Sequence, residues 1–424
     1  MSCVVYEDGA VAFRQKVVLS VLTNRPIRIK NIRSKSKDPG ITSAEVDILK
    51  IIHEISNGAI VRINDTGCNV YFSPGTLVGG EVEFKCSTER GLGYYLEPLL
   101  LLCSFTKSSL HLTLNGVTNN SIDPSVDVIL QSWIPFLKNL LPEASKGALG
   151  LNIVKRGVAP KGGGQIVFTS KPALLLSPLR LIKADKVYRV RGVAWTCRVS
   201  PAFASQVMIG AKQLLNTFLS DVYITLDQRK ARFIICSYIQ LMLTLREFGG
   251  GSSGFGIVLW AVTKEKLVYT ADACNAVEGG KKASPNPVVP SELGLEAASR
   301  LLNQIYLGGC VDESLQSVAL SLMALEGGRN ASQLLISEPT PHTVQTLRLL
   351  QKTLGVTFDF SYSDRVKLDG FGLQTEAEAA EGKENGMQTS MDADIEGGDD
   401  VEKPIPLVAT CFGSGIKNIN MAIR

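Results

Sequence analysis

The chain has 424 residues, of which 45% are hydrophobic and 20% charged, a composition typical of a folded protein with one large and one smaller domain. Its net charge of +4 is small for this length, so charge alone does not indicate a nucleic-acid-binding protein. The apolar stretch from Phe233 to Leu245 is shorter than the roughly 20 residues that cross a bilayer, which excludes a membrane anchor there. No basic leader precedes an apolar core at the start, so we expect the protein to stay inside the cell.

Metal-ligating residue types are dispersed along the sequence. Nine cysteines occur without a C-x-x-C pair, and the three histidines are His53, His111 and His342. A structural zinc site needs four clustered nitrogen or sulfur ligands. We therefore predict reduced, mostly buried thiols and no metal site.

Apolar periodicity predicts a first unit of secondary structure near the N-terminus. Thr42 or Ser43 can cap its second helix, and Gly58 can end it. The expected elements are a helix from Arg14 to Leu22, a strand from Ile27 to Ile32, a helix from Thr42 to Asn57, and strands from Ile60 to Asn64 and from Asn69 to Ser73.

The same order of elements recurs twice. The second unit is expected as helix Gly91 to Phe105, strand Leu110 to Leu114, helix Pro124 to Leu140, and strands Leu149 to Val154 and Gln165 to Thr169. The third is expected as helix Glu313 to Leu325, strand Gln333 to Ser337, helix Thr343 to Leu354, and strands Val356 to Phe360 and Leu407 to Cys411. Three helix-strand-helix-strand-strand repeats therefore predict an α/β (α+β) fold.

The domain organisation follows from where this order is interrupted. The repeats predict a large domain from residues 1–185 and 281–424, with a smaller α/β domain inserted at 186–280. The acidic segment 374–403 has almost no large apolar residues, so we expect a disordered loop.

Several strings resemble the RNA 3'-terminal phosphate cyclase family over nearly the whole chain. They are F-R-Q-K-V-V-L-S at Phe13 to Ser20, R-G-L-G-Y-Y-L-E at Arg90 to Glu97, and K-R-G-V-A-P-K-G-G-G-Q at Lys155 to Gln165. The strings at Gly116 to Asp127, Gly308 to Gln316 and Thr410 to Gly415 resemble the eukaryotic cyclase-like branch of that family. The resemblance implies the repeat fold with its inserted domain.

The resemblance also implies a test of the nucleotide pocket. Cyclases pass AMP from ATP to a histidine and then to an RNA 3'-phosphate, and their N-terminal motif reads E-G-G-G-Q-I-L-R. The matching stretch here keeps Glu7 and Arg14, but it has a single glycine, and Val11 replaces the amide. A Cβ blocks close backbone approach to phosphate, and Asp8 adds negative charge. We therefore expect no bound nucleotide cofactor.

Three further residues bear on this chemistry. Where cyclases carry an Asp-Gln pair, this chain has Ser317 and Val318, and valine cannot form a hydrogen bond. Against this, His342 falls where cyclases carry the adenylylated histidine. It is either that nucleophile or a partly exposed polar residue at a helix N-terminus without chemistry.

Basic residues suggest two anion-binding regions, each with a plain structural alternative. The glycine run Gly162, Gly163 and Gly164 follows Lys155, Arg156 and Lys161; it is either a nest of backbone N–H groups for phosphate or a tight turn between strands. The densest basic cluster is either a solvated strand edge or a contact for an RNA backbone or an acidic partner. Its members are Arg25, Arg28, Lys30, Arg33, Lys35 and Lys37.

An apolar stretch at 227–248 has no counterpart in the resemblance. It is either a surface helix covering a partner site or an error in how the gene was translated into protein.

The resemblance favours a nucleolar, and so nuclear, ribosome-assembly factor of the small-subunit processome. Such a factor supports pre-rRNA cleavage without cyclase activity, with a ribosome-assembly GTPase, pre-rRNA and a small nucleolar ribonucleoprotein as partners and no membrane. The alternatives are an active cyclase using ATP and His342, or a pre-rRNA endoribonuclease.

Overall fold

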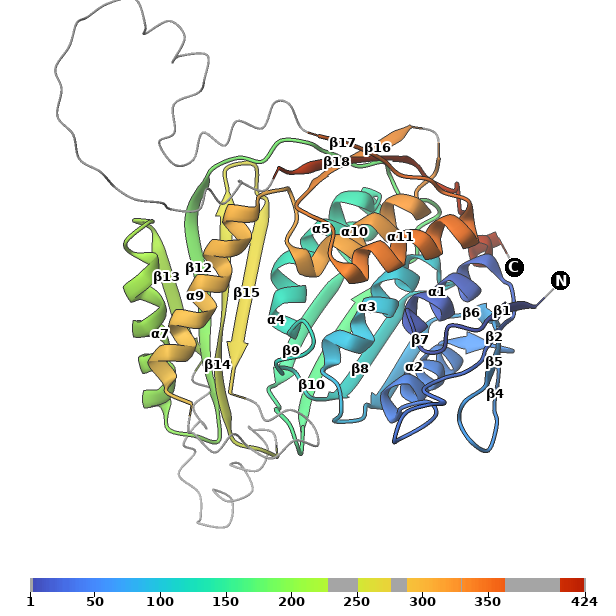
Figure 1. Cartoon of the computed structure of the whole chain (residues 1–424), viewed down its shortest axis with the longest axis horizontal. Helices are drawn as coiled ribbons and strands as arrows, with labels where there is room; N and C mark the ends of the chain where they lie inside the picture. The colour runs from blue at the N-terminus through green and yellow to red at the C-terminus, as the bar shows by residue number, and fades with distance from the viewer. Residues whose placement is uncertain (1–2, 228–250, 276–287, 329, 363–404, 423–424) are drawn as a thin grey trace, which may run out of the picture.

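The computed structural model describes residues 3–227, 251–275, 288–328, 330–362 and 405–422. The expectations for residues 228–248 and for the acidic segment 374–403 lie outside these ranges. Helices and mixed sheets alternate along the described chain, so the α/β fold class is confirmed. Figure 1 shows the strands closest to the N-terminus at one end of the molecule and a separate sheet with two helices at the other.

The first sheet has the strand order β1-β2-β5-β4, in which β1 and β2 are parallel and the remaining pairs antiparallel. Strand β2 ends three residues earlier than predicted because Asn31 and Arg33 adopt left-handed backbone conformations that interrupt an extended chain. The elements are β1 (Val4–Tyr6), α1 (Phe13–Thr23), β2 (Ile27–Ile29), α2 (Ser43–Glu54), β4 (Ile60–Ile63) and β5 (Val70–Ser73), with a small pair of β3 (Ser56–Asn57) and β6 (Thr76–Leu77).

The second sheet repeats this arrangement as β7-β8-β10-β9, with only β7 and β8 parallel. The helix expected from Pro124 to Leu140 is present but irregular, because Pro135 has no N–H and the chain passes through a π-helical turn just before it. The elements are β7 (Gly80–Lys85), α3 (Leu92–Leu102), η1 (Cys103–Phe105), β8 (Leu110–Gly116), α4 (Val126–Val128), η2 (Ile129–Trp133), α5 (Ile134–Leu140), α6 (Glu143–Lys146), β9 (Gly150–Lys155) and β10 (Gly164–Ser170).

The third sheet has the same pattern of directions in the order β11-β16-β18-β17. Helices α1, α3, α10 and α11 contact one another, and one continuous hydrophobic core joins all three sheets. The elements are β11 (Arg180–Leu181), α10 (Glu313–Leu325), β16 (Ala331–Ile336), α11 (Pro341–Leu354), β17 (Asp359–Tyr362), β18 (Leu407–Phe412) and η4 (Ile419–Ala422).

The inserted unit is a four-stranded sheet with helices α7 and α9 packed against one face (Figure 1). Helix α9 follows the expected boundary at residue 280, yet its side chains Leu293, Ala297 and Leu301 belong to the core of this unit. The packing therefore extends this unit to α9. Its elements are β12 (Val187–Cys197), α7 (Pro201–Leu215), β13 (Val222–Asp227), β14 (Gly254–Thr263), β15 (Val268–Cys274) and α9 (Pro290–Leu307), in the sheet order β13-β12-β14-β15.

Candidate functional site

Three helices bring Arg14, Glu97 and His342 together. Arg14 lies in the first turn of α1, Glu97 in the middle of α3 and His342 in the first turn of α11. The guanidinium of Arg14 forms an ion pair with Glu97 and donates a hydrogen bond to the carbonyl of Tyr94 at 3.1 Å. Glu97 Oε1 lies 3.4 Å from His342 Nε2. The carboxylate thus separates the arginine from the histidine.

Gln15 completes this group. Its Nε2 donates to Glu97 Oε1 at 2.7 Å and lies 3.1 Å from His342 Nε2. The Glu97 side chain is only 7% exposed, whereas that of His342 is 40% exposed. An internal carboxylate therefore lies beneath a histidine that solvent reaches.

The electrostatics of the group favour an ionised Glu97. Burial alone would raise its pKa, but the charge of Arg14 and the hydrogen bonds from His342 and Gln15 hold the pKa of Glu97 below its ordinary value. Glu97 is consequently a fixed negative charge at neutral pH.

Gln316 on α10 positions the start of α11. Its Nε2 donates to Ser337 Oγ at 2.7 Å, and its Oε1 accepts from the backbone N–H of Thr340 at 3.3 Å and from Thr343 Oγ1 at 3.2 Å. Gln316 is fully buried. Because Thr340 caps α11, these bonds fix the turn that carries His342.

The N-terminal loop holds Glu7 and Gly9, which belong to the expected remnant of a nucleotide pocket. The Glu7 side chain is 72% exposed and lies 3.5 Å from Lys30 Nζ. The remaining glycine, Gly9, has a φ of +64°, and a Cβ there would be 2.8 Å from a backbone oxygen of Asn31. Its conformation is therefore required for packing of the loop.

A buried lysine lies beneath this loop. Lys16 donates to Asp8 Oδ1 at 2.7 Å and to the carbonyl of Gly9 at 3.1 Å, and its side chain is 1% exposed. Desolvation lowers the pKa of Lys16, although Asp8 acts in the opposite direction. Sequence reasoning missed Lys16 because it directly follows Arg14 and Gln15, and no local pattern shows that its side chain is buried.

Ser317 and Val318 lie in the interior of α10, 5% and 2% exposed respectively. Ser317 accepts a hydrogen bond from Ser321 through its backbone carbonyl. Val318 belongs to the main hydrophobic core. These two positions contribute to packing in this structure.

The predicted basic cluster divides into paired and exposed members. Arg33 makes a bidentate contact with Glu45, at 2.8 and 2.6 Å, which raises the pKa of Arg33. Lys30 pairs with Glu7. The exposed members are Arg25, Arg28, Lys35 and Lys37. Arg33 is therefore part of the fold, and Arg28 lies on an open sheet face.

Arg156 is buried, contrary to the expectation that it contributes to a surface anion site. Its Nη atoms contact both carboxylate oxygens of Asp127 at 2.6 and 2.8 Å, and its Nε contacts Asp227 at 2.8 Å. Asp227 belongs to β13, so Arg156 links the inserted unit to the large one. Its neighbours Lys155 and Lys161 are half-buried and exposed, respectively.

The glycine run forms a turn. The N–H of Gly162 donates to the carbonyl of Val158 at 3.0 Å, and Gly164 begins β10. Gly162 and Gly163 have φ values of +63° and +84°. Because the Gly162 N–H is already bonded within the chain, the geometry supports the turn between strands rather than a phosphate nest there.

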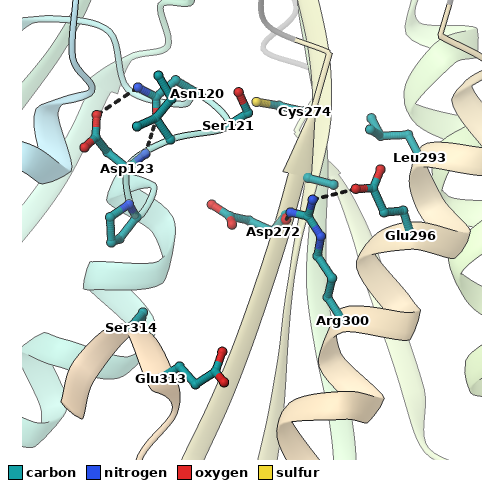
Figure 2. Close-up of a pocket in the computed structure, with 13 residues that line it drawn as sticks. Asn120, Ser121, Asp123, Asp272, Cys274, Leu293, Glu296, Arg300, Glu313 and Ser314 are labelled. Atoms are coloured by element: carbon teal, nitrogen blue, oxygen red, sulfur yellow. Dashed lines mark hydrogen bonds and ion pairs between the residues drawn. The ribbon is translucent and has the colours of Figure 1, made fainter. Parts of the chain in front are cut away.

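A cavity of about 490 Å³ lies between the two units (Figure 2). Asp272 on β15 faces the segment that holds Asn120 and Asp123, and burial raises the pKa of Asp272 to about 6. On the opposite wall, Arg300 contacts Glu296 at 2.5 Å. Of the five charged residues that line the cavity, four are carboxylates and one is Arg300, so the lining disfavours an anionic ligand.

The described residues contain neither a cluster of metal ligands nor a membrane-spanning helix. Among the described residues, no group of three or more His, Cys, Asp or Glu side chains is arranged to hold a metal ion. Most of the described cysteines are buried. Within the described ranges, no helix combines the length and apolar character needed to cross a membrane.

Comparison with known proteins agrees with this fold. Residues 5–360 match the family model of the RNA 3'-terminal phosphate cyclases. The chain is 38% identical over 350 residues to the human RNA 3'-terminal phosphate cyclase-like protein, covering 82% of this chain and 88% of that relative. It is 34% identical over 416 residues to the probable cyclase-like protein of Caenorhabditis elegans, covering 98% of both.

A further relative carries a functional name. The chain is 36% identical over 319 residues to the rRNA processing protein rcl1 of Schizosaccharomyces pombe, covering 75% of this chain and 80% of that relative. The family match extends over most of the chain, and several relatives are more than 30% identical to it. This protein therefore belongs to the RNA 3'-terminal phosphate cyclase family.

Proposed function

We propose that this protein is a pre-rRNA-processing factor for the small ribosomal subunit that does not cyclise RNA. It acts in the nucleolus within the small-subunit processome, together with pre-rRNA, a small nucleolar ribonucleoprotein and a ribosome-assembly GTPase. The name of the fission yeast relative supports the rRNA-processing role.

The observation that carries the proposal is the position of Glu97. A cyclase must bring the phosphates of ATP to its nucleophilic histidine, and a cation beside that histidine assists by neutralising phosphate charge. Here the guanidinium of Arg14 is neutralised by Glu97, whose Oε1 also lies 3.4 Å from His342 Nε2. The carboxylate therefore neutralises the positive charge that an anionic ligand beside His342 would need.

Charge repulsion between the Glu97 carboxylate and a phosphate group would weaken ATP binding beside His342. Two like unit charges 4 Å apart repel by about 4 kcal/mol at an effective dielectric constant of 20, which is roughly a thousandfold in affinity. The lowered pKa of Glu97 means that the carboxylate remains charged at neutral pH. An ATP phosphate that approaches the exposed side of His342 would therefore be repelled by this carboxylate, and Arg14 would not be free to offset the repulsion.

The same geometry argues against RNA cleavage by Glu97 and His342. A general base works best when its pKa lies near the operating pH. Glu97 is buried and its pKa is lowered, so it is a weak base that a ribose hydroxyl does not reach. The arrangement supports an assembly role over the endoribonuclease.

Genetic replacement tests the proposal. Cells depleted of the protein are complemented with wild type or with His342→Ala, and pre-rRNA cleavage and the ratio of small- to large-subunit rRNA are measured. We expect depletion to lower small-subunit rRNA and both forms to restore it. Co-purification of pre-rRNA and a GTPase with the tagged protein is the accompanying measurement.

Normal rRNA ratios after depletion would contradict the assembly role. Failure of a folded His342→Ala variant, with thermal stability equal to wild type, would instead indicate that His342 does chemistry.

A further inference from the structure

The outer face of the first sheet presents a row of side chains across its strands. Arg28 on β2 is paired in register with Tyr71 on β5, which is paired in turn with Arg62 on β4. Both arginines are exposed and Tyr71 is half-buried. The alternate residues, such as Ile29 and Phe72, point into the core, as the two-residue period of a strand requires.

These three residues line an open hollow of about 640 Å³ at the end of the molecule opposite the inserted unit (Figure 1). The guanidinium carbon of Arg28 lies 5.8 Å from the centre of the Tyr71 ring. None of the residues that line this hollow is a carboxylate.

The two arginines carry uncompensated charge. Among the residues that the structure describes, no carboxylate lies within ion-pair distance of either Arg28 or Arg62. Glu7, the nearby acid on β1's side of the sheet, pairs instead with Lys30 at 3.5 Å. Arg25, at the start of β2, is also exposed and adds positive charge. This differs from Arg33 and Arg156, whose guanidinium groups are used within the fold.

We propose that this surface, formed by Arg28, Tyr71 and Arg62, binds single-stranded RNA. The arginines contact backbone phosphates, and a base stacks on the exposed part of the Tyr71 ring. Aromatic rings between cationic side chains on an open sheet are suited to unpaired bases, because every base has a π-face. An acidic peptide would use the arginines but gain little from the ring.

The inference rests on the proposed function only in naming pre-rRNA as the cellular ligand. The surface itself is tested with a synthetic single-stranded oligoribonucleotide of mixed sequence. Binding of the full chain is followed by fluorescence anisotropy at several salt concentrations, so that the result does not depend on ribosome assembly.

Arg28→Ala/Arg62→Ala tests the phosphate contacts. Each phosphate contact to a single strand contributes about 0.7 to the slope of log affinity against log salt, so removing two lowers that slope by about 1.4. The matched control is Lys171→Ala/Arg180→Ala, which removes the same charge from exposed positions elsewhere. We expect the control to bind as the wild type does.

Tyr71→Ala and Tyr71→Phe test the stacking contact. Loss of one stacked base lowers affinity roughly tenfold or more, whereas phenylalanine retains the π-face and stays within about twofold of wild type. Thermal melting of each variant verifies that the protein is folded.

Binding that is unchanged in Arg28→Ala/Arg62→Ala, or lost equally in the control, would overturn the inference while leaving the assembly role intact. Wild type that binds polyglutamate but not RNA would also overturn it. A variant could also lose RNA binding and still support normal rRNA ratios. That result would confirm that this surface binds RNA, and it would count against pre-rRNA as the cellular ligand.

Discussion

Glu97 Oε1 lies 3.4 Å from His342 Nε2 although 245 residues separate the two in sequence. The other oxygen of the same carboxylate pairs with Arg14. A residue that could act as a nucleophile is thus held beside a permanent internal anion. This relationship predicts properties of both stability and activity.

Glu97→Gln should destabilise the protein by about 3 kcal/mol, because it leaves the guanidinium of Arg14 partly buried without a counter-ion. Arg14→Gln/Glu97→Gln should cost less than the sum of the single variants. The urea midpoint of unfolding measures these changes. An exposed pair gives the control: Arg300→Ala, which breaks the contact with Glu296, should cost less than about 1 kcal/mol. Strict additivity of the Arg14 and Glu97 variants would contradict the pairing.

The ion pair between Glu97 and Arg14 should also make the stability of the fold decrease at low pH. The folded-state pKa of Glu97 lies below its value of about 4.3 in an unfolded chain, so the pair stabilises the fold above that pH. Its contribution is lost as the pH falls through the folded-state pKa. Thermal melting between neutral pH and pH 3 should show a smaller acid loss for Glu97→Gln than for wild type. Parallel curves for the two proteins would show that the carboxylate is not the titrating group.

Asp272 should make the stability of the fold depend on pH in the opposite direction to Glu97. Burial, with a smaller effect from nearby Asp127, raises the folded-state pKa of Asp272 to about 6, although Ser125 and Arg300 act to lower it. The unfolded chain ionises more readily, so stability is lost as pH rises from about 4 through 6. Asp272→Asn keeps an oxygen for the Ser125 N–H and should be more stable than wild type at pH 7. Melting curves at pH 4 and pH 7 test this, and an equal difference between the proteins at both values would refute it.

Arg156→Ala should be among the most damaging substitutions in the described chain. It removes the ion pairs that Asp127 and Asp227 form with Arg156 at the junction of the two units, a loss of about 3 to 5 kcal/mol. Lys161→Ala, nearby but exposed, should change stability by less than about 0.5 kcal/mol. Chemical denaturation compares them. Equal stability of the two variants would show that the Arg156 network contributes nothing net.

Local sequence patterns predicted many of the elements. Helix α2 has the predicted cap at Thr42, which forms the reciprocal hydrogen bonds of a capping box with Glu45. The helix from Glu313 to Leu325 has the predicted bounds because Asp312 caps it and its apolar side chains are continuous. Strand β7 was missed although Val82 and Phe84 alternate with glutamates, a pattern that could have revealed it.

The features that could not be predicted from the sequence depend on contacts between residues that are distant in the chain. Arg156 stands in a basic string, and only its contacts with Asp127 and with Asp227 on β13 show that it is buried. Glu97 appeared in the sequence only as part of a family string. Its contacts with Arg14 and His342 arise from the packing of three helices that no local pattern specifies.

Mass spectrometry after incubation with saturating ATP and Mg²⁺ tests the central claim most directly. The wild-type protein should show no covalent AMP on His342, because the Glu97 carboxylate is fixed between that histidine and Arg14. An AMP adduct on wild-type protein that disappears in His342→Ala would contradict the account and identify the protein as an active cyclase.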